Sequence, residues 1–343
     1  MKSTVIERRA ERLQLYTRLP WQSALHRVQA AAPRSTLIPQ PHPHQVLLEA
    51  YLLHQLAWPR ICTLRPWGIR HVDPRPASLK IAFEDEDVNR RHLEESMPRE
   101  LARTLLPRAD DTGGVSGITG VRVAVERDTI VLRRLGSLGS ITLAGISPKD
   151  WRDAVDYQDE KEVEYGMTLC HRDSPNQWHP IERAYVGEYS WPTTDTNKTA
   201  WLASGLLRRA GLLRTVGVPL HTTAWTNPAD DDGEQWIIEH EHEVASCPAH
   251  HQRFMALLTD PEWGLPLTET HSVCSCGRYP GESNECRVEA RSSEGKPGEL
   301  QMRFTRRTGT WLEPYKRPQS EYERRQRLYV TAPAPAAGSP VSA

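Results

Sequence analysis

Cysteine and histidine side chains concentrate in one short stretch of this chain. The sequence holds 6 cysteines and 14 histidines, and nine of these twenty residues fall between His240 and Cys286 in a chain of 343 residues. An even distribution would place about three of them there. Thiolate and imidazole groups are ligands that zinc prefers in proteins. The stretch therefore predicts a zinc site, with a C-terminal region that folds around the metal.

Two short motifs supply the first predicted set of ligands. Cys247-Pro248-Ala249-His250 places two ligands three residues apart on a tight turn, and Cys274-Ser275-Cys276-Gly277 ends on a glycine that permits a positive φ. The segment between them has room for a helix at 253–258. The motifs resemble a generic zinc-ribbon or treble-clef knuckle over about 30 residues, with His in place of the second Cys and C-x-C in place of C-x₂-C. The predicted metal ligands are thus Cys247, His250, Cys274 and Cys276.

A second set of ligands is the alternative. Cys286 becomes a ligand if His250 or His251 is not used. His240 and His242 lie in the sequence WIIEHEHEV, where the strand period of two places them on one face and the neighbouring glutamates on the other. Two imidazoles on one face can chelate a catalytic metal with an open position. The other interpretation is an exposed strand face edged by histidines. The alternative ligands are therefore His240, His242, His251 and Cys286.

The periodicity of apolar residues predicts an α+β fold. The first hundred or so residues read as helices, for example over 46–58, where apolar residues recur at helical spacing. Val121, Val123 and Val125 then alternate with polar residues, which predicts a central antiparallel sheet over 121–144. The predicted units are a mainly helical domain at 1–110, an antiparallel meander plus helix at 118–195, and an α+β region with the Cys/His cluster at 196–330. A disordered tail at 331–343 completes the chain.

The composition bounds the class of protein. The N-terminal sequence MKSTVIERRAER has no apolar core of a secretory signal, and no run of 18 apolar residues occurs. Four of the six cysteines belong to the cluster, which favours reduced thiols over a disulfide framework. We therefore expect a cytoplasmic protein that does not span a membrane. Walker, G-x-G-x-x-G, G-x-S-x-G and H-E-x-x-H motifs are absent from the sequence.

Basic residues near the C-terminus give a candidate nucleic-acid interface. Residues 287–330 carry eleven Lys or Arg and six Asp or Glu, whereas the whole chain has a net charge of −1. Cations interleaved with aromatic residues suit single strands or RNA loops, where bases stack. The other interpretation is a charged hairpin and helix. The predicted nucleic-acid-binding residues are Arg303, Arg306, Arg307, Lys316, Arg317 and Arg324.

Three functional hypotheses follow from these patterns. The first is a zinc-stabilised, non-enzymatic binding protein whose partner is nucleic acid, another polyanion or a protein. The second is a metal-dependent hydrolase or nuclease that uses His240 and His242 with a carboxylate such as Asp232. The third is a structural assembly protein without metal. Whether the protein is an enzyme stays open at this point.

Overall fold

The computed structural model describes residues 4–32, 35–56, 65–83, 96–188, 194–229, 233–243, 250–275 and 284–306. The helices of the described residues are α1 (Val5–Thr17), α2 (Trp21–Ala30), α3 (Pro43–Leu56), η1 (Pro66–Gly68), α4 (Met97–Leu105), α5 (Pro148–Glu164), α6 (Cys170–Asp173), α7 (Pro180–Glu188), α8 (Thr194–Leu207), η3 (Ala210–Thr215) and α9 (His250–Leu258). The strands are β1 (Ile69–Arg75), β2 (Ser78–Phe83), β3 (Arg108–Ala109), β4 (Val115–Ser116), β5 (Val121–Glu126), β6 (Thr129–Arg134), β7 (Ser140–Ala144), β8 (Val218–Ala229), β9 (Gly233–Glu243), β10 (Leu267–Cys274), β11 (Asn284–Ser292) and β12 (Glu299–Arg306).

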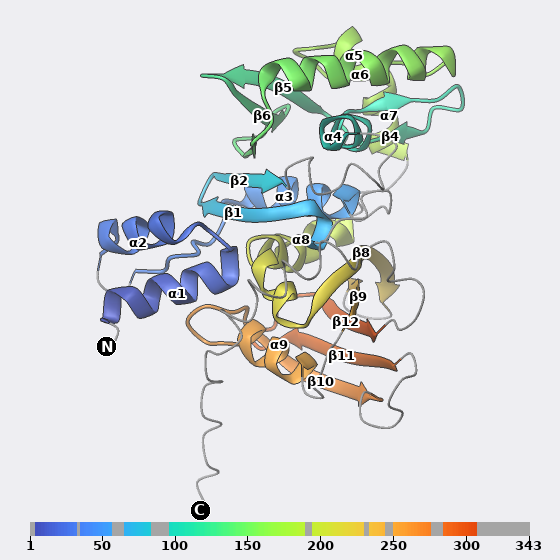
Figure 1. Ribbon diagram of the computed structural model, residues 1–343. Helices are drawn as coiled ribbons and strands as arrows, with labels where there is room; N and C mark the ends of the chain where they lie inside the picture. The colour runs from blue at the N-terminus through green and yellow to red at the C-terminus, as the bar shows by residue number, and fades with distance from the viewer. Residues whose placement is uncertain are drawn as a thin grey trace, which may run out of the picture.

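The predicted α+β class is confirmed. The strands form two five-stranded mixed sheets and one small two-stranded sheet. The first large sheet has the order β1-β2-β7-β6-β5, and the second has the order β10-β11-β12-β9-β8 (Figure 1). In each large sheet one neighbouring pair is parallel, β2 with β7 and β12 with β9, and the other pairs are antiparallel.

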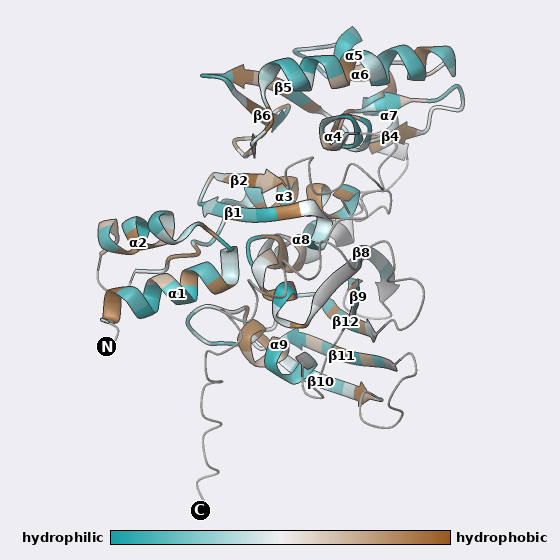
Figure 2. Cartoon of the chain, viewed as in Figure 1, coloured by the Kyte–Doolittle hydropathy of each residue, from teal (hydrophilic) through white to brown (hydrophobic). Residues whose placement is uncertain are grey.

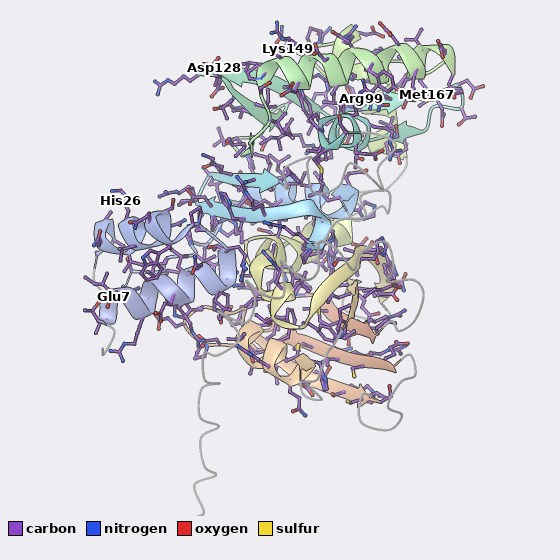
Figure 3. The ribbon with its side chains drawn as sticks, viewed as in Figure 1. Glu7, His26, Arg99, Asp128, Lys149 and Met167 are labelled. Atoms are coloured by element: carbon purple, nitrogen blue, oxygen red, sulfur yellow. The ribbon has the colours of Figure 1, made fainter. Side chains whose placement is uncertain are left out.

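The predicted meander over 121–144 is confirmed as β5, β6 and β7. The prediction of an antiparallel central sheet is wrong for the sheet as a whole, because β2 pairs with β7 in parallel. Arg127 and Asp128 join β5 to β6 with φ values of 46° and 61°. Two central residues with positive φ make a type I′ turn, whose twist matches that of an antiparallel pair. Figure 3 labels Asp128 at this turn, away from the body of the first sheet. Helix α5, which carries both hydrophilic and hydrophobic residues, packs beside β6 (Figure 2).

The prediction of helices throughout the first hundred residues is wrong for 69–83. That segment forms β1 and β2, which pair from Ile69↔Phe83 to Arg75↔Ser78. Leu79 and Ile81 are fully buried, whereas Lys80 between them is exposed, so β2 has the strand period of two. The pairing of β2 with β7 joins this segment to the meander and crosses the predicted boundary near residue 110. The division into three units otherwise stays a prediction, and the tail at 331–343 lies outside the described residues.

A buried ion pair fastens α3 to α8, which pack against each other. Arg208 donates from Nε and Nη2 to the two carboxylate oxygens of Glu49, both at 2.7 Å. Ser204 and Gln45 donate to the same carboxylate at 2.5 Å and 2.7 Å. Gln45 also accepts from the backbone N–H of Ser140 in β7. These contacts connect the first sheet to the helix that lies under the second sheet.

Helices α8 and α9 cover one face of the second sheet. Trp236 on β9 is fully buried and donates from Nε1 to Thr199 of α8 at 3.1 Å. Phe304 on β12 contacts Phe254 of α9, with ring centroids 5.3 Å apart. Figure 1 shows α9 beside β10 and β11 in orange. The Cys/His-rich part of the sheet therefore lies under α9. Among the described helices, none is long and apolar enough to cross a membrane.

Two histidines in this fold make its stability depend on pH. Burial lowers the pKa of His54 to about 4, and burial together with Arg70 lowers the pKa of His71 to about 4. Between the ordinary histidine pKa of about 6.5 and pH 4, the unfolded chain therefore binds protons that the folded chain does not. The stabilisation that comes from keeping these two histidines neutral is expected to be fully present above pH 6.5. The free energy of unfolding should then fall as the pH drops toward 4. Urea unfolding of metal-free protein at pH 7.5 and pH 5 measures this loss.

The matched variants for this measurement are His54→Gln and His71→Gln. Each should make the free energy of unfolding less dependent on pH. Equal pH dependence in the parent protein and both variants would contradict the assignment.

Candidate metal centre

Three ligand residues meet beside the end of the second sheet. The ligand atoms of His251, Cys274 and Cys286 lie within 4.8 Å of one another. They come from α9, β10 and β11, three separate elements of the C-terminal region. His251 and Cys286 are buried, with 3% and 1% of their surfaces exposed, and Cys274 is exposed. The group therefore has a protected side and an accessible side.

The pairing of β10 with β11 brings the two cysteines together. Cys274 and Cys286 are direct partners in this antiparallel pair, so their side chains point to the same face of the sheet. Their Sγ atoms are 3.4 Å apart. This distance is too long for a disulfide, in which the sulfurs are about 2.05 Å apart. It is close to the separation of about 3.8 Å that two thiolates have when both bind one tetrahedral zinc with Zn–S bonds of about 2.3 Å.

The helical period of α9 brings His251 to the two thiols. Phe254, Met255 and Leu258 follow His251 at the spacings i+3, i+4 and i+7, and all are buried. This spacing places His251 on the face of α9 that packs on the sheet. Because His251 lies in the first turn of α9, its imidazole reaches the sheet where the helix begins. The buried apolar residues of α9 thus orient the side chain of His251 toward the two thiols on the sheet.

The structure brings some of the predicted ligands together and does not describe the others. Cys274 belongs to the first predicted set, and the structure brings it together with His251 and Cys286 from the alternative set. Cys247 and Cys276 lie outside the described residues, as does the side chain of His250. The three residues close to one another are thus a different combination from the first predicted set, and the places of Cys247, His250 and Cys276 in a site stay predictions.

His240 and His242 lie on the same buried face but in a separate group. Both are fully buried, and their rings stack with centroids 5.6 Å apart. The prediction that they share one face of a strand is thus confirmed, and the interpretation as an exposed face is wrong because α9 and its neighbours cover this face. Nδ1 of His240 lies 2.8 Å from the hydroxyl of Thr222 on β8, and Nδ1 of His242 donates to the backbone carbonyl of His240 at 3.3 Å.

One strand separates the histidine pair from the metal centre. The register across the sheet reads Cys274, Cys286, Phe304, His240 and Thr222 in a single row. Neighbouring strands are about 4.8 Å apart, so the backbones of β11 and β9 lie roughly 10 Å apart on either side of β12. Within the described residues, no carboxylate joins His240 and His242 as a third close ligand. Asp232, the carboxylate suggested by the sequence, lies outside those residues.

Arg303 lies on the opposite face of the second sheet. Among the predicted nucleic-acid-binding residues, it is the one whose side chain the structure describes. Arg303 lies over the ring of Trp225, with its guanidinium carbon 5.5 Å from the ring centroid, and donates to Gln301. Its partners in the register are Glu239 on β9 and Arg287 on β11. The same face carries both signs of charge, with Glu239, Glu241, Glu285, Glu289 and Glu299 beside Arg287, Arg291 and Arg303. The described part of this face therefore lacks a concentration of positive charge. Arg307, Lys316, Arg317, Arg324 and the side chain of Arg306 lie outside the described part.

A cavity that the sequence did not reveal lies between α2 and the turn from β1 to β2. It has a volume of about 620 Å³ and is lined by Arg27, Asp73 and Arg75 among apolar groups such as Leu37 and Pro39. Arg27 pairs with Asp73 at 2.5 Å and donates to the carbonyl of Pro74. Asp73 also lies 3.4 Å from Arg75, so the two guanidinium groups that line the cavity share one carboxylate.

Cys170 gives a contrast with the thiols of the metal centre. It is fully buried at the start of α6, and burial, with a contribution from Glu182, raises the pKa of its thiol to about 12. A thiol with so high a pKa is a poor metal ligand and a poor nucleophile at neutral pH. Cys170 is therefore a suitable control position for experiments on Cys274 and Cys286.

Comparisons of the whole chain with known proteins give no match. No protein-family model, no curated protein and no solved structure is significantly similar to it.

Proposed function

We propose that this chain is a zinc-stabilised, non-enzymatic binding protein in which zinc fastens α9 to β10 and β11. The observation that carries the proposal is the meeting of His251, Cys274 and Cys286 from three elements, with ligand atoms within 4.8 Å of one another. Two thiolates and one imidazole are a donor set typical of zinc sites. A metal held by three elements stabilises the packing of the helix on the sheet.

The surroundings of the group favour a structural over a catalytic role. A catalytic zinc needs an open position and a group that moves protons, usually a carboxylate or a histidine near the bound water. Among the described residues, neither a carboxylate oxygen nor a second imidazole nitrogen lies in the group with His251, Cys274 and Cys286. The remaining members of the first predicted set, Cys247, His250 and Cys276, are the sequence candidates for a fourth ligand. With any one of them the site would be closed, as structural zinc sites are.

The proposed partner of the C-terminal region is a polyanion such as nucleic acid, or a protein. The cluster of Lys and Arg between 303 and 327 supports a polyanion, because phosphate contacts are made mainly by these side chains. The mixed charge around Arg303 supports a protein partner.

Metal analysis of the purified full chain tests the proposal. About one zinc per chain is expected, and Cys286→Ala is expected to reduce the zinc content to near zero because it removes a buried ligand. Cys170→Ala is the matched control and should keep the metal content of the parent protein. Of the variants Cys247→Ser, His250→Ala and Cys276→Ser, the one that removes the fourth ligand should weaken zinc binding, and the other two should not. Zinc-free protein whose stability is unchanged by added zinc would refute the metal centre.

A further inference from the structure

We propose that Cys274 and Cys286 form an oxidation-sensitive pair that releases the metal when peroxide joins them in a disulfide. This inference rests on the proposed metal centre and adds a mode of regulation to it. Its basis is that two thiols from neighbouring strands lie 3.4 Å apart, one exposed and one with only 1% of its surface exposed. The same two sulfurs would then either bind the metal or form a disulfide, but could not do both at once.

The geometry of the strand pair allows the disulfide to form with little movement. Direct partners in an antiparallel pair have Cβ atoms about 4.5–5.5 Å apart. A disulfide requires a Cβ separation of about 3.5–4.5 Å and a sulfur separation of about 2.05 Å. The sulfurs of Cys274 and Cys286 must therefore approach by about 1.4 Å from their present 3.4 Å. Rotation of the side chains and a small shift of the edge strand can supply this movement.

The difference in exposure sets the order of the two steps. Cys274 is exposed and lies at the end of β10, which is the edge strand of the sheet. A peroxide dissolved in water therefore meets Cys274 first. Cys286 is covered on the second strand, so it reacts with the oxidised Cys274 rather than with the peroxide.

The chemistry balances with hydrogen peroxide as the only oxidant. The thiolate of Cys274 attacks one peroxide oxygen, the O–O bond breaks, and hydroxide leaves and takes up a proton to become water, which produces a sulfenic acid. The thiolate of Cys286 then attacks the sulfur of that sulfenic acid, the S–O bond breaks, and a second water leaves. In total, two thiols lose two electrons and two protons, and one peroxide becomes two waters.

The disulfide and the metal exclude each other because zinc binds thiolates. After oxidation, His251 alone remains of the three described ligands, so the metal should leave. The oxidised protein then differs from reduced, metal-free protein in that a disulfide joins β10 to β11. In both forms, α9 has lost the link to these strands that the metal provides.

The experiment is a peroxide titration of the zinc-loaded full chain. Released zinc is measured with a chromogenic chelator, remaining thiols are counted, and the linked peptides are identified by mass spectrometry after digestion. We expect one zinc released and two thiols lost per chain, together with a peptide that joins Cys274 to Cys286. A thiol reductant with added zinc should restore both values.

Two variants separate the roles of the sulfurs. In Cys286→Ala, the sulfenic acid on Cys274 should persist and be trapped by dimedone, whereas Cys274→Ala should show no trapping at Cys286. Cys170→Ala should respond to peroxide as the parent protein does. The wild-type peptide map keeps the test decisive even where a variant fails to fold.

The possible failures are distinguishable. Zinc that binds but stays bound under peroxide, or a disulfide that joins a different pair of cysteines, overturns the redox inference and leaves the metal centre standing. A chain that never binds zinc overturns the proposed function, and the metal-release inference fails with it.

Discussion

Withdrawing zinc from the metal-loaded chain with a chelator is expected to loosen the start of α9 and strand β10 while the first sheet stays intact. In the proposed centre, the metal would link His251 at the beginning of α9 to Cys274 and Cys286 on the sheet. Residues 268–274 of β10 are exposed, and β10 has a neighbouring strand on one side only. Little apolar burial therefore remains to hold this strand once the metal has left.

The far end of α9 has attachments that do not depend on the metal. The hydroxyl of Tyr16 in α1 donates to the carbonyl of Leu257 at 2.6 Å, and Arg12 pairs with Asp260 at 2.8 Å. Phe254 and Leu258 are buried in the core. We therefore expect local opening at the beginning of α9 rather than release of the whole helix.

Amide hydrogen exchange measures this local effect. Metal at a free concentration 100 times its Kd stabilises the bound state by about 2.7 kcal/mol, which corresponds to roughly 100-fold faster exchange after removal of the metal. The acceleration is expected over 250–258 and 267–275. The meander over 121–144 is the internal control and should exchange at the same rate with and without metal. Uniform acceleration over both sheets, or none, would contradict the local role.

The candidate ligands show which part of the proposed site the sequence could predict. The density of Cys and His pointed to the region in which His251, Cys274 and Cys286 come together, and Cys274 belonged to the first predicted set. Cys286 was only an alternative because its closeness to Cys274 depends on the register of β10 with β11. The sequence LTETHSVC of β10 has no alternation of apolar and polar residues, so neither the strand nor its register could be read from it.

His240 and His242 show a different limit of prediction from the sequence. The period of two correctly predicted that they share one strand face. Their burial depends on α9, which lies over that face and begins after β9 has ended. The alternation along a strand gives its two faces, but which face is covered depends on the position of another element.

The segment 69–83 contains a local signal for a strand. The apolar residues Leu79 and Ile81 flank the polar Lys80, which is the period of two that a strand has. The partner strand β7 begins more than fifty residues later, and such parallel pairing over a long distance leaves no local pattern. The same holds for the parallel pair of β12 and β9. The α+β class was therefore predictable from the sequence, whereas the order of strands in the sheets was not.

The second large effect is expected from Glu49→Gln, which should lower the free energy of unfolding by about 3–5 kcal/mol. Both carboxylate oxygens of Glu49 accept hydrogen bonds from Arg208, and both side chains are almost completely buried. Glutamine removes the negative charge and turns one acceptor into a donor. The guanidinium of Arg208 then remains buried without a counter-ion, and one of its N–H groups faces another donor.

Asp153→Asn is the matched control for the loss of an ion-paired carboxylate. Asp153 pairs with Lys149 across one helical turn of α5, and their side chains are 60% and 76% exposed. Such an exposed pair contributes little to the free energy of unfolding, because solvent screens the two charges. Urea unfolding followed by circular dichroism compares the two variants under the same conditions. Glu49→Asp, which keeps the charge, is expected to lie between Glu49→Gln and the parent protein. If Glu49→Gln were no less stable than Asp153→Asn, the ion pair between α3 and α8 would not be what holds these helices together; a large loss confined to Glu49→Gln identifies the buried charge itself as the cause.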